Sequence, residues 1–145
     1  MSGFSNIEDR SAYALWTEER IRNFDTDQFR HVNNAAIASY CEAGRMALFA
    51  EPSLADAMAE LQIVVVKLTI TFEQELFFPG VVCIGTRVVN VGNTSFSVDQ
   101  GLFGPAGRFA VSEATCVTMS VSQGRPIRVP DALRAILKSR TETVS

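Results

Sequence analysis

The 145-residue sequence falls in the size range of one folded domain, and we predict a single domain over residues 1–145. Hydrophobic residues make up 47% of the chain and charged residues 20%, a composition that is typical of globular proteins and excludes extensive disorder. The formal net charge of −3 argues against a nucleic-acid-binding protein, whose affinity depends mainly on neutralising phosphates.

The cysteines and the apolar runs indicate where the protein works. Cys41, Cys83 and Cys116 lie far apart in apolar surroundings. Because this spacing is that of neither a disulfide framework nor a zinc site, we expect buried thiols in a reducing, cytoplasmic environment. The N-terminal residues include acids where a signal peptide needs an apolar core. The longest apolar run, Ile63–Val66, is far too short to span a membrane.

The first half of the chain predicts one strand and one long helix. Side chains alternate in character along Tyr13–Phe24, which favours a strand. From Asn34 to Phe49 the period becomes helical, with an apolar stripe formed by Ile37, Tyr40, Cys41, Gly44 and Leu48. Asn33 or Asn34 supplies the N-cap, and Pro52 ends the helix because it disfavours helical backbone in the residue before it. A short second helical segment is expected over Pro52–Glu60.

The second half predicts four strands and a closing helix. Gly-, Pro- and Asn-containing turns divide this part of the chain. The expected strands are Gln62–Glu73, Val81–Val91, Thr94–Phe103 and Arg108–Ser122, and the closing helix is Val129–Arg140.

Two strands carry side-chain patterns that suggest how the elements pack. Simple alternation along Gln62–Glu73 gives one fully apolar face and one half-apolar face; the apolar set is Val64, Val66, Leu68, Ile70 and Phe72. In Arg108–Ser122, Phe109 belongs to a face of larger side chains, and the other face is small: Ala110, Ser112, Ala114, Cys116 and Thr118. The small face leaves room for the long helix to approach. We therefore predict an α+β fold in which a five-stranded antiparallel sheet wraps around that helix.

The segment before the helix concentrates polar side chains. It contains Asp25, Asp27 and the only histidine of the chain, His31, within seven positions. Such a segment is a helix cap, a metal-binding loop or a reaction centre. A calcium loop is excluded because Phe29 and His31 occupy ligand positions and Arg30 stands where the turn glycine belongs. A zinc site would lack neighbours to complete the ligand set, and no metal is expected.

The same segment resembles the signature of a known family. The run "DTDQFRHVNNAAIASYCEAGR" is similar to that of the 4-hydroxybenzoyl-CoA thioesterase family of hotdog-fold proteins. The resemblance continues in "FFPG", in "GNTSF" and in "RPIRVPDALRAIL", and so covers nearly the whole chain. It implies an acyl-CoA thioesterase that needs no cofactor. It also implies a homodimer or homotetramer with active sites at the subunit interface.

The resemblance assigns roles to the residues around the helix start. Asp27 stands at the position of the nucleophile or general base. The backbone N–H groups of the first helical turn are candidate donors to the oxyanion, which small Ala35 would leave accessible. Asn33, Asn34 and His31 complete the predicted catalytic set and are expected to organise the loop, with His31 as the catalytic base as the alternative. Asp25 is expected to be structural.

Further positions have weaker assignments. Ser95 is a candidate for the pantetheine arm or the neighbouring subunit, and Tyr40 and Phe96 are candidates for the acyl pocket. For these residues a plain strand-start serine and core packing are the alternatives. Candidates for the nucleotide phosphates of CoA are Lys67, Arg87, Arg108, Arg125 and Arg128, each of which is otherwise a surface charge.

The sequence departs from the family pattern at three positions. Arg30 stands where the family usually has the glycine that precedes His-Val-Asn-Asn. Ile37 replaces an aromatic residue, and Val81 stands where the family commonly has aspartate. Arg30 is expected to alter the loop's path and is a candidate to select an acidic acyl group. Two other functions remain open at this point. One is a non-catalytic acyl-thioester-binding module, and the other is a hydratase or dehydratase using His31 with Asp27.

Overall fold

The computed structural model describes residue 7 and residues 10–141. In these residues a short 3-10 turn (Arg10–Ala12) precedes the other elements, and a second follows the first strand, at Asn23–Asp25. The strands are β1 (Leu15–Arg20), β2 (Leu61–Phe72), β3 (Val81–Val89), β4 (Ser95–Gly104) and β5 (Gly107–Ser120). The helices are α1 (Asn34–Phe49), α2 (Pro52–Ala57) and α3 (Asp131–Lys138). Most of the N-terminal stretch that argued against a signal peptide lies outside the described residues.

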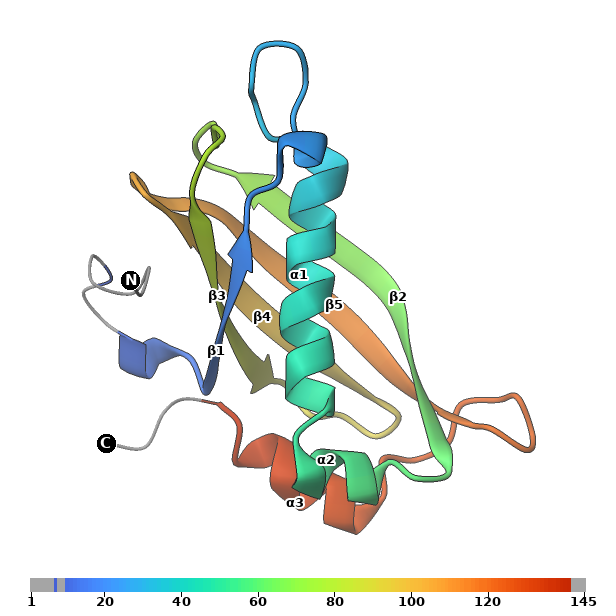
Figure 1. Ribbon diagram of the computed structural model, residues 1–145. Coiled ribbons are helices and arrows are strands. Elements are labelled where there is room, and N and C mark those ends of the chain that lie inside the picture. The colour runs from blue at the N-terminus through green and yellow to red at the C-terminus, as the bar shows by residue number, and fades with distance from the viewer. Residues whose placement is uncertain (1–6, 8–9, 142–145) are drawn as a thin grey trace.

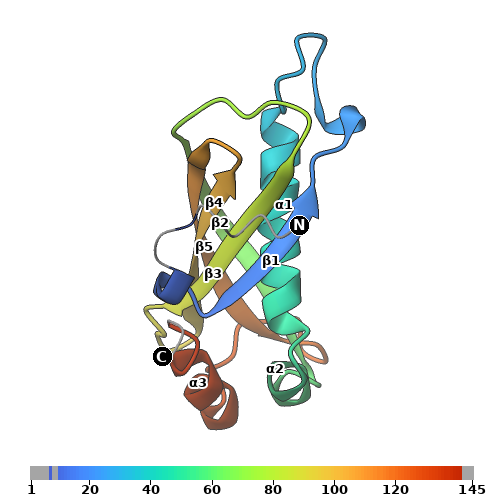
Figure 2. The same ribbon diagram turned by 60° about the vertical axis from the view of Figure 1, so that its left-hand side comes forward.

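The strands form one antiparallel sheet in the order β1-β3-β4-β5-β2, and α1 lies across one of its faces (Figure 1). This confirms the predicted α+β architecture. Helices α2 and α3 pack together beyond the C-terminal end of α1, far from the loop that precedes this helix (Figures 1 and 2). The two ends of α1 therefore lie in different surroundings.

Helix α1 packs against β1, β3 and β4 through its predicted apolar stripe. Gly44 lets it approach closely: a Cβ atom there would lie 2.5 Å from Gln100 Nε2 and 2.8 Å from Ile84 Cγ2. Gln100 is buried and donates from Nε2 to the carbonyl of Cys41 (2.9 Å) and to Thr86 Oγ1 (3.1 Å). A polar side chain thus fastens the middle of the helix to the sheet.

The predicted first strand is too long. Strand β1 ends at Arg20, and the 3-10 turn Asn23–Asp25 occupies its expected C-terminal part. The Asp25 carboxylate accepts a hydrogen bond from the Arg22 backbone N–H (3.0 Å) and closes this turn. A local side-chain bond to the backbone has replaced the strand's ladder.

Simple alternation along β2 holds only on one side of an irregularity: Leu68 and Phe72 share a face as predicted, but Val64 faces the opposite side. A bulge lies between Val65 and Lys67, so that Val65 pairs with Cys116 and Leu68 pairs with Ala114. An extra residue in a strand reverses the face of the sheet on which each later side chain of that strand lies. Val65 and Leu68 therefore lie on the same face, the one that carries the small side chains of β5.

Phe109 was also placed on the wrong face. The register between β4 and β5 shifts at this point, and Phe109 is buried in the core cluster together with the neighbouring Ala110. The predicted small face of β5 is buried as expected. However, α1 lies mainly over β1, β3 and β4, so β2 stays at the open edge with Val65, Val66, Leu68 and Phe72 exposed.

Candidate active site

The residues between Asp25 and Asn33 form a narrow loop at the N-terminal end of α1. Thr26 pairs with Val32 across its stem, and the Asp27 N–H donates to the His31 carbonyl at 2.9 Å. Arg30 has a φ of 67°, the left-handed conformation that glycine adopts easily. The chain at Arg30 therefore adopts the backbone conformation that a glycine favours. The guanidinium of Arg30 lies over the Phe78 ring, 4.6 Å from its centroid.

Asp27 organises this loop with one of its two carboxylate oxygens. Oδ1 accepts hydrogen bonds from the backbone N–H groups of Phe29 (2.9 Å) and His31 (3.0 Å). No described residue donates to Oδ2. The two bonds to Oδ1 thus fix the orientation of the Asp27 carboxylate.

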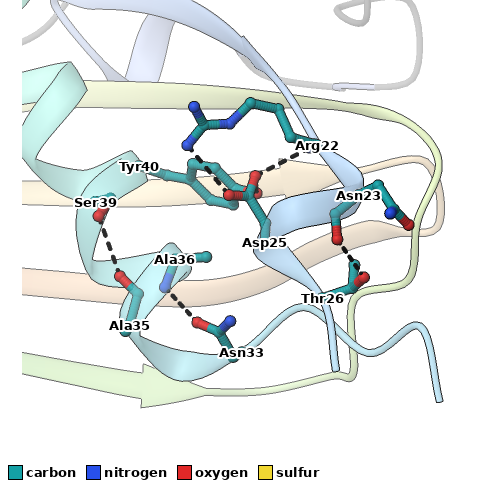
Figure 3. Close-up of polar contacts among 9 residues, drawn as sticks. All are labelled: Arg22, Asn23, Asp25, Thr26, Asn33, Ala35, Ala36, Ser39 and Tyr40. Carbon is teal, nitrogen blue, oxygen red and sulfur yellow. Dashed lines mark hydrogen bonds and ion pairs between the residues drawn. The ribbon is translucent and has the colours of Figure 1, made fainter. Parts of the chain in front are cut away.

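Asp25 precedes the loop and is buried, with 5% of its surface exposed. Figure 3 draws its contacts with Arg22 and Tyr40. Its Oδ2 accepts from the Tyr40 hydroxyl (2.7 Å) and from the Arg22 N–H, and its Oδ1 accepts from the Arg22 guanidinium (3.2 Å). Burial raises the pKa of Asp25, but these hydrogen bonds outweigh it and hold the pKa below its usual value. Burial and the contact with Asp25 raise the pKa of the Tyr40 hydroxyl, which stays a donor.

Asn33 caps α1. Its Oδ1 accepts from the Ala36 N–H at 2.8 Å, and its own N–H donates to the Asp25 carbonyl at 3.0 Å (Figure 3 draws the cap). The first N–H groups of a helix have no intrahelical acceptor. Those of Asn34 and Ala35 belong to exposed residues, and the dipole of α1 places partial positive charge there.

A cavity of about 570 Å³ adjoins both groups. Its lining includes Asp27, His31 and the Asn33–Asn34 helix start, with Ile37 from α1 and residues 72–76 that end β2 and follow it. The His31 ring lies 4.6 Å from the Phe77 ring in an edge-to-face arrangement, and its Nε2 lies 3.9 Å from Glu75 Oε2.

The charged groups of the lining are mainly acidic. Besides Asp27 they include Glu73, which pairs with Arg108 (2.7 Å), and Glu75. The sequence alone does not assign Glu73 and Glu75 to the site. Their signal was the acidic run "EQE" directly after a strand, but only the fold brings it to the helix start.

The structure brings Asp27, His31, Asn33 and Asn34 together, with Ala35 beside them at the exposed first turn. Other candidates lie elsewhere in the single chain. Tyr40 is buried against Asp25, and Phe96 is buried in the cluster that packs against α2 and α3. Lys67 is exposed on β2, and Ser95 begins β4.

No group of three or more His, Cys, Asp or Glu side chains that could hold a metal ion occurs in residue 7 or residues 10–141. Among the same residues, no helix has the length and apolar character needed to cross a membrane.

A five-stranded antiparallel sheet wrapped around one long helix is the arrangement of the hotdog class of proteins. Residues 21–137 match the family model of the thioesterase-like superfamily, and the chain belongs to this family of thioester hydrolases. The resemblance found in the sequence and the hotdog fold are both confirmed.

Solved structures agree in fold. A predicted thioesterase from Bacillus stearothermophilus has 22% identity and a TM-score of 0.79, over 90% of this chain and 98% of that one. A thioesterase from Thermus thermophilus, complexed with coenzyme A and zinc, has 23% identity and a TM-score of 0.77, over 88% and 95%. The DHNA-CoA thioesterase of Staphylococcus aureus has 18% identity and a TM-score of 0.73, over 86% and 89%. No curated protein matches the sequence.

Proposed function

We propose that this protein is an acyl-CoA thioesterase that hydrolyses a fatty or aromatic acyl thioester to the free acid and CoA. The observation that carries the proposal is the juxtaposition of the Asp27 carboxylate with the exposed first turn of α1 in one cavity. The family supports thioester hydrolysis in general. The structure with bound coenzyme A supports CoA as the thiol part of the substrate.

The chemistry follows from these two groups. Asp27 Oδ2 either attacks the thioester carbonyl carbon or removes a proton from the attacking water. The carbonyl oxygen becomes negatively charged, and the N–H groups of Asn34 and Ala35 donate to it. Collapse of the intermediate breaks the C–S bond and releases CoA as a thiolate, which takes its proton from Asp27 in the general-base route and from solvent in the nucleophilic route. In the nucleophilic route, water then hydrolyses the acyl-aspartate. Neither route requires a metal or a cofactor.

The lining of the cavity supports an uncharged acyl group. Asp27 and Glu75 carry negative charge there, and the third carboxylate, Glu73, is paired with Arg108. Arg30, a candidate to select an acidic acyl group, stacks on Phe78 outside the lining. An acyl chain that ends in a carboxylate would be repelled. A fatty or aromatic acyl group meets Ile37, Phe72 and Leu76 instead.

We further propose a homodimer that joins two β2 strands. β2 lies at the sheet edge, and Val66 has 60% of its surface exposed and Phe72 46%. An open edge with exposed apolar side chains favours pairing with another strand. The adjacent cavity would then lie beside the second protomer, as the family resemblance implies.

The arrangement gives less support to a hydratase. Such an enzyme would use the His31 imidazole with the Asp27 carboxylate in proton transfer. Here the contact with Asp27 comes from the His31 backbone, and the imidazole is directed toward Glu75 and Phe77.

The test is thiol release from a panel of acyl-CoAs that differ in chain length and in aromatic content. Asp27→Asn keeps a carbonyl oxygen for the two backbone N–H groups but removes the charge, so we expect kcat to fall by about 10²–10⁴-fold in a folded protein. Asp56→Asn, the same change on the exposed face of α2, is the control. Wild type without turnover of any thioester would refute the function, and a fully active Asp27→Asn would refute the role of Asp27.

A further inference from the structure

Asp25 joins three separate parts of the site although it does not line the cavity. Its carboxylate holds Arg22, which follows β1, and the Tyr40 hydroxyl, which comes from the second turn of α1 (Figure 3). Its backbone carbonyl accepts from the N–H of Asn33, the cap of that helix. The segment after β1 and the helix body therefore meet at the Asp25 carboxylate, and the helix cap is held by the backbone carbonyl of the same buried residue.

The Asp27 carboxylate and the N–H groups at the start of α1 are the proposed reacting groups, and the chain connects both of them to Asp25. The loop that carries Asp27 leaves the core at Asp25 and returns at Asn33, and its stem closes through Thr26 and Val32. The proposed oxyanion donors belong to the next two residues after Asn33. A shift of about 1 Å between such groups is enough to cost roughly a hundredfold in rate.

We propose that Asp25 and Tyr40 form a positioning pair that sets the separation between Asp27 and the N-terminus of α1. The inference rests on the proposed function. Neither residue of the pair lines the cavity, so the pair acts through the loop and the helix and not through contact with substrate. Tyr40, which the resemblance made a candidate for the acyl pocket, thus holds the reacting groups in position.

Tyr40→Phe removes the hydrogen bond at 2.7 Å and keeps the packed ring. We expect kcat to fall at least tenfold while KM changes less than twofold, because substrate contacts are intact but the alignment of Asp27 is lost. The melting temperature will also fall, as it does for any lost buried hydrogen bond. Stability alone therefore cannot decide the matter.

Thr118→Val is the matched control. Thr118 is buried in β5 and its hydroxyl donates to the Ile127 carbonyl at 2.7 Å, away from the cavity. We expect a comparable fall in melting temperature with kcat within twofold of wild type. Each enzyme is assayed at the same interval below its own melting temperature, so that partial unfolding does not contribute.

Asp25→Asn provides a second variant if Tyr40→Phe does not fold, because it keeps the size of the side chain but removes its charge and one of the two oxygens that accept from Tyr40 and Arg22. The double variant should lose less kcat than the product of the two single losses, since the bond between Tyr40 and Asp25 is affected by both changes. If Tyr40→Phe or Asp25→Asn loses stability but keeps wild-type kcat, the positioning role is overturned and the proposed function stands. If wild type hydrolyses no thioester, both are overturned.

Discussion

Adding one methyl group at Gly44 should push α1 away from the sheet. The new Cβ of Gly44→Ala would lie 2.5 Å from Gln100 Nε2 and 2.9 Å from Thr86 Oγ1. Ordinary contacts lie at about 3.5 Å or more, so the helix must move by about 1 Å or Gln100 must leave its place. Gln100 cannot leave freely, because its amide holds Cys41 and Thr86.

The expected cost follows from these contacts. Overpacking of a core costs about 1–3 kcal/mol, and a buried amide that loses its partners costs about another 1–3 kcal/mol. Alanine regains about 1 kcal/mol over glycine in a helix. The net loss of unfolding free energy is therefore about 1–5 kcal/mol, centred near 3. In a chain of this size a loss of about 3 kcal/mol lowers the melting temperature by roughly 6–12 °C.

Calorimetry and urea unfolding measure this loss, and the double variant with Gln100→Ala tests its cause. Because removing the Gln100 side chain also removes the nearest clash, the double variant should lose less stability than the sum of the single variants. Thiol release should slow in Gly44→Ala, since α1 carries the proposed oxyanion donors. A Gly44→Ala protein as stable as wild type would refute this account of helix–sheet packing.

Three other predictions address acyl charge, acid stability and assembly. An acyl-CoA ending in a carboxylate should be hydrolysed roughly threefold to tenfold more slowly than its neutral isostere, and Glu75→Gln should reduce this difference in rate. Equal rates for the two acyl groups in wild type would contradict repulsion by the acidic lining. Because hydrogen bonds hold the pKa of Asp25 below its unfolded value, its contribution to stability is present above about pH 4 and is lost as the pH falls through the folded pKa. The urea midpoint of Asp25→Asn should therefore fall less than that of wild type between about pH 5 and pH 2.5. If the midpoints of both proteins fall by the same amount, Asp25 does not contribute to the acid sensitivity of the fold. Replacing Val66 and Leu68 on β2 with lysine should shift the sedimentation coefficient toward the monomer value, and an unchanged coefficient would exclude dimerisation through this edge.

Local signals identified the parts of the chain where neighbours in sequence decide the structure. The spacing of Ile37, Cys41 and Leu48 predicts the long helix, because an apolar stripe acts within a few turns. The sequence left its cap open between Asn33 and Asn34, and the structure has Asn33 there. The motif before the helix sufficed for the family, since it carries the residues of the site in one short segment. The acidic and polar cluster at the helix start was therefore visible without a structure.

What the sequence left undecided depends on contacts between distant segments. The bulge near Val66 follows from pairing β2 with β5, and no alternation within β2 reveals it. Glu73 and Glu75 come to the cavity because β2 ends beside the start of α1.

Tyr40 shows the same division between sequence and tertiary structure. It fits the apolar stripe of α1 in the sequence, but Asp25, fifteen positions earlier in the chain, determines what its hydroxyl does. The sequence by itself determined the elements, the family and the residues at the helix start. The tertiary structure decided which side chains face the cavity, because facing depends on register and on partners far away in the chain.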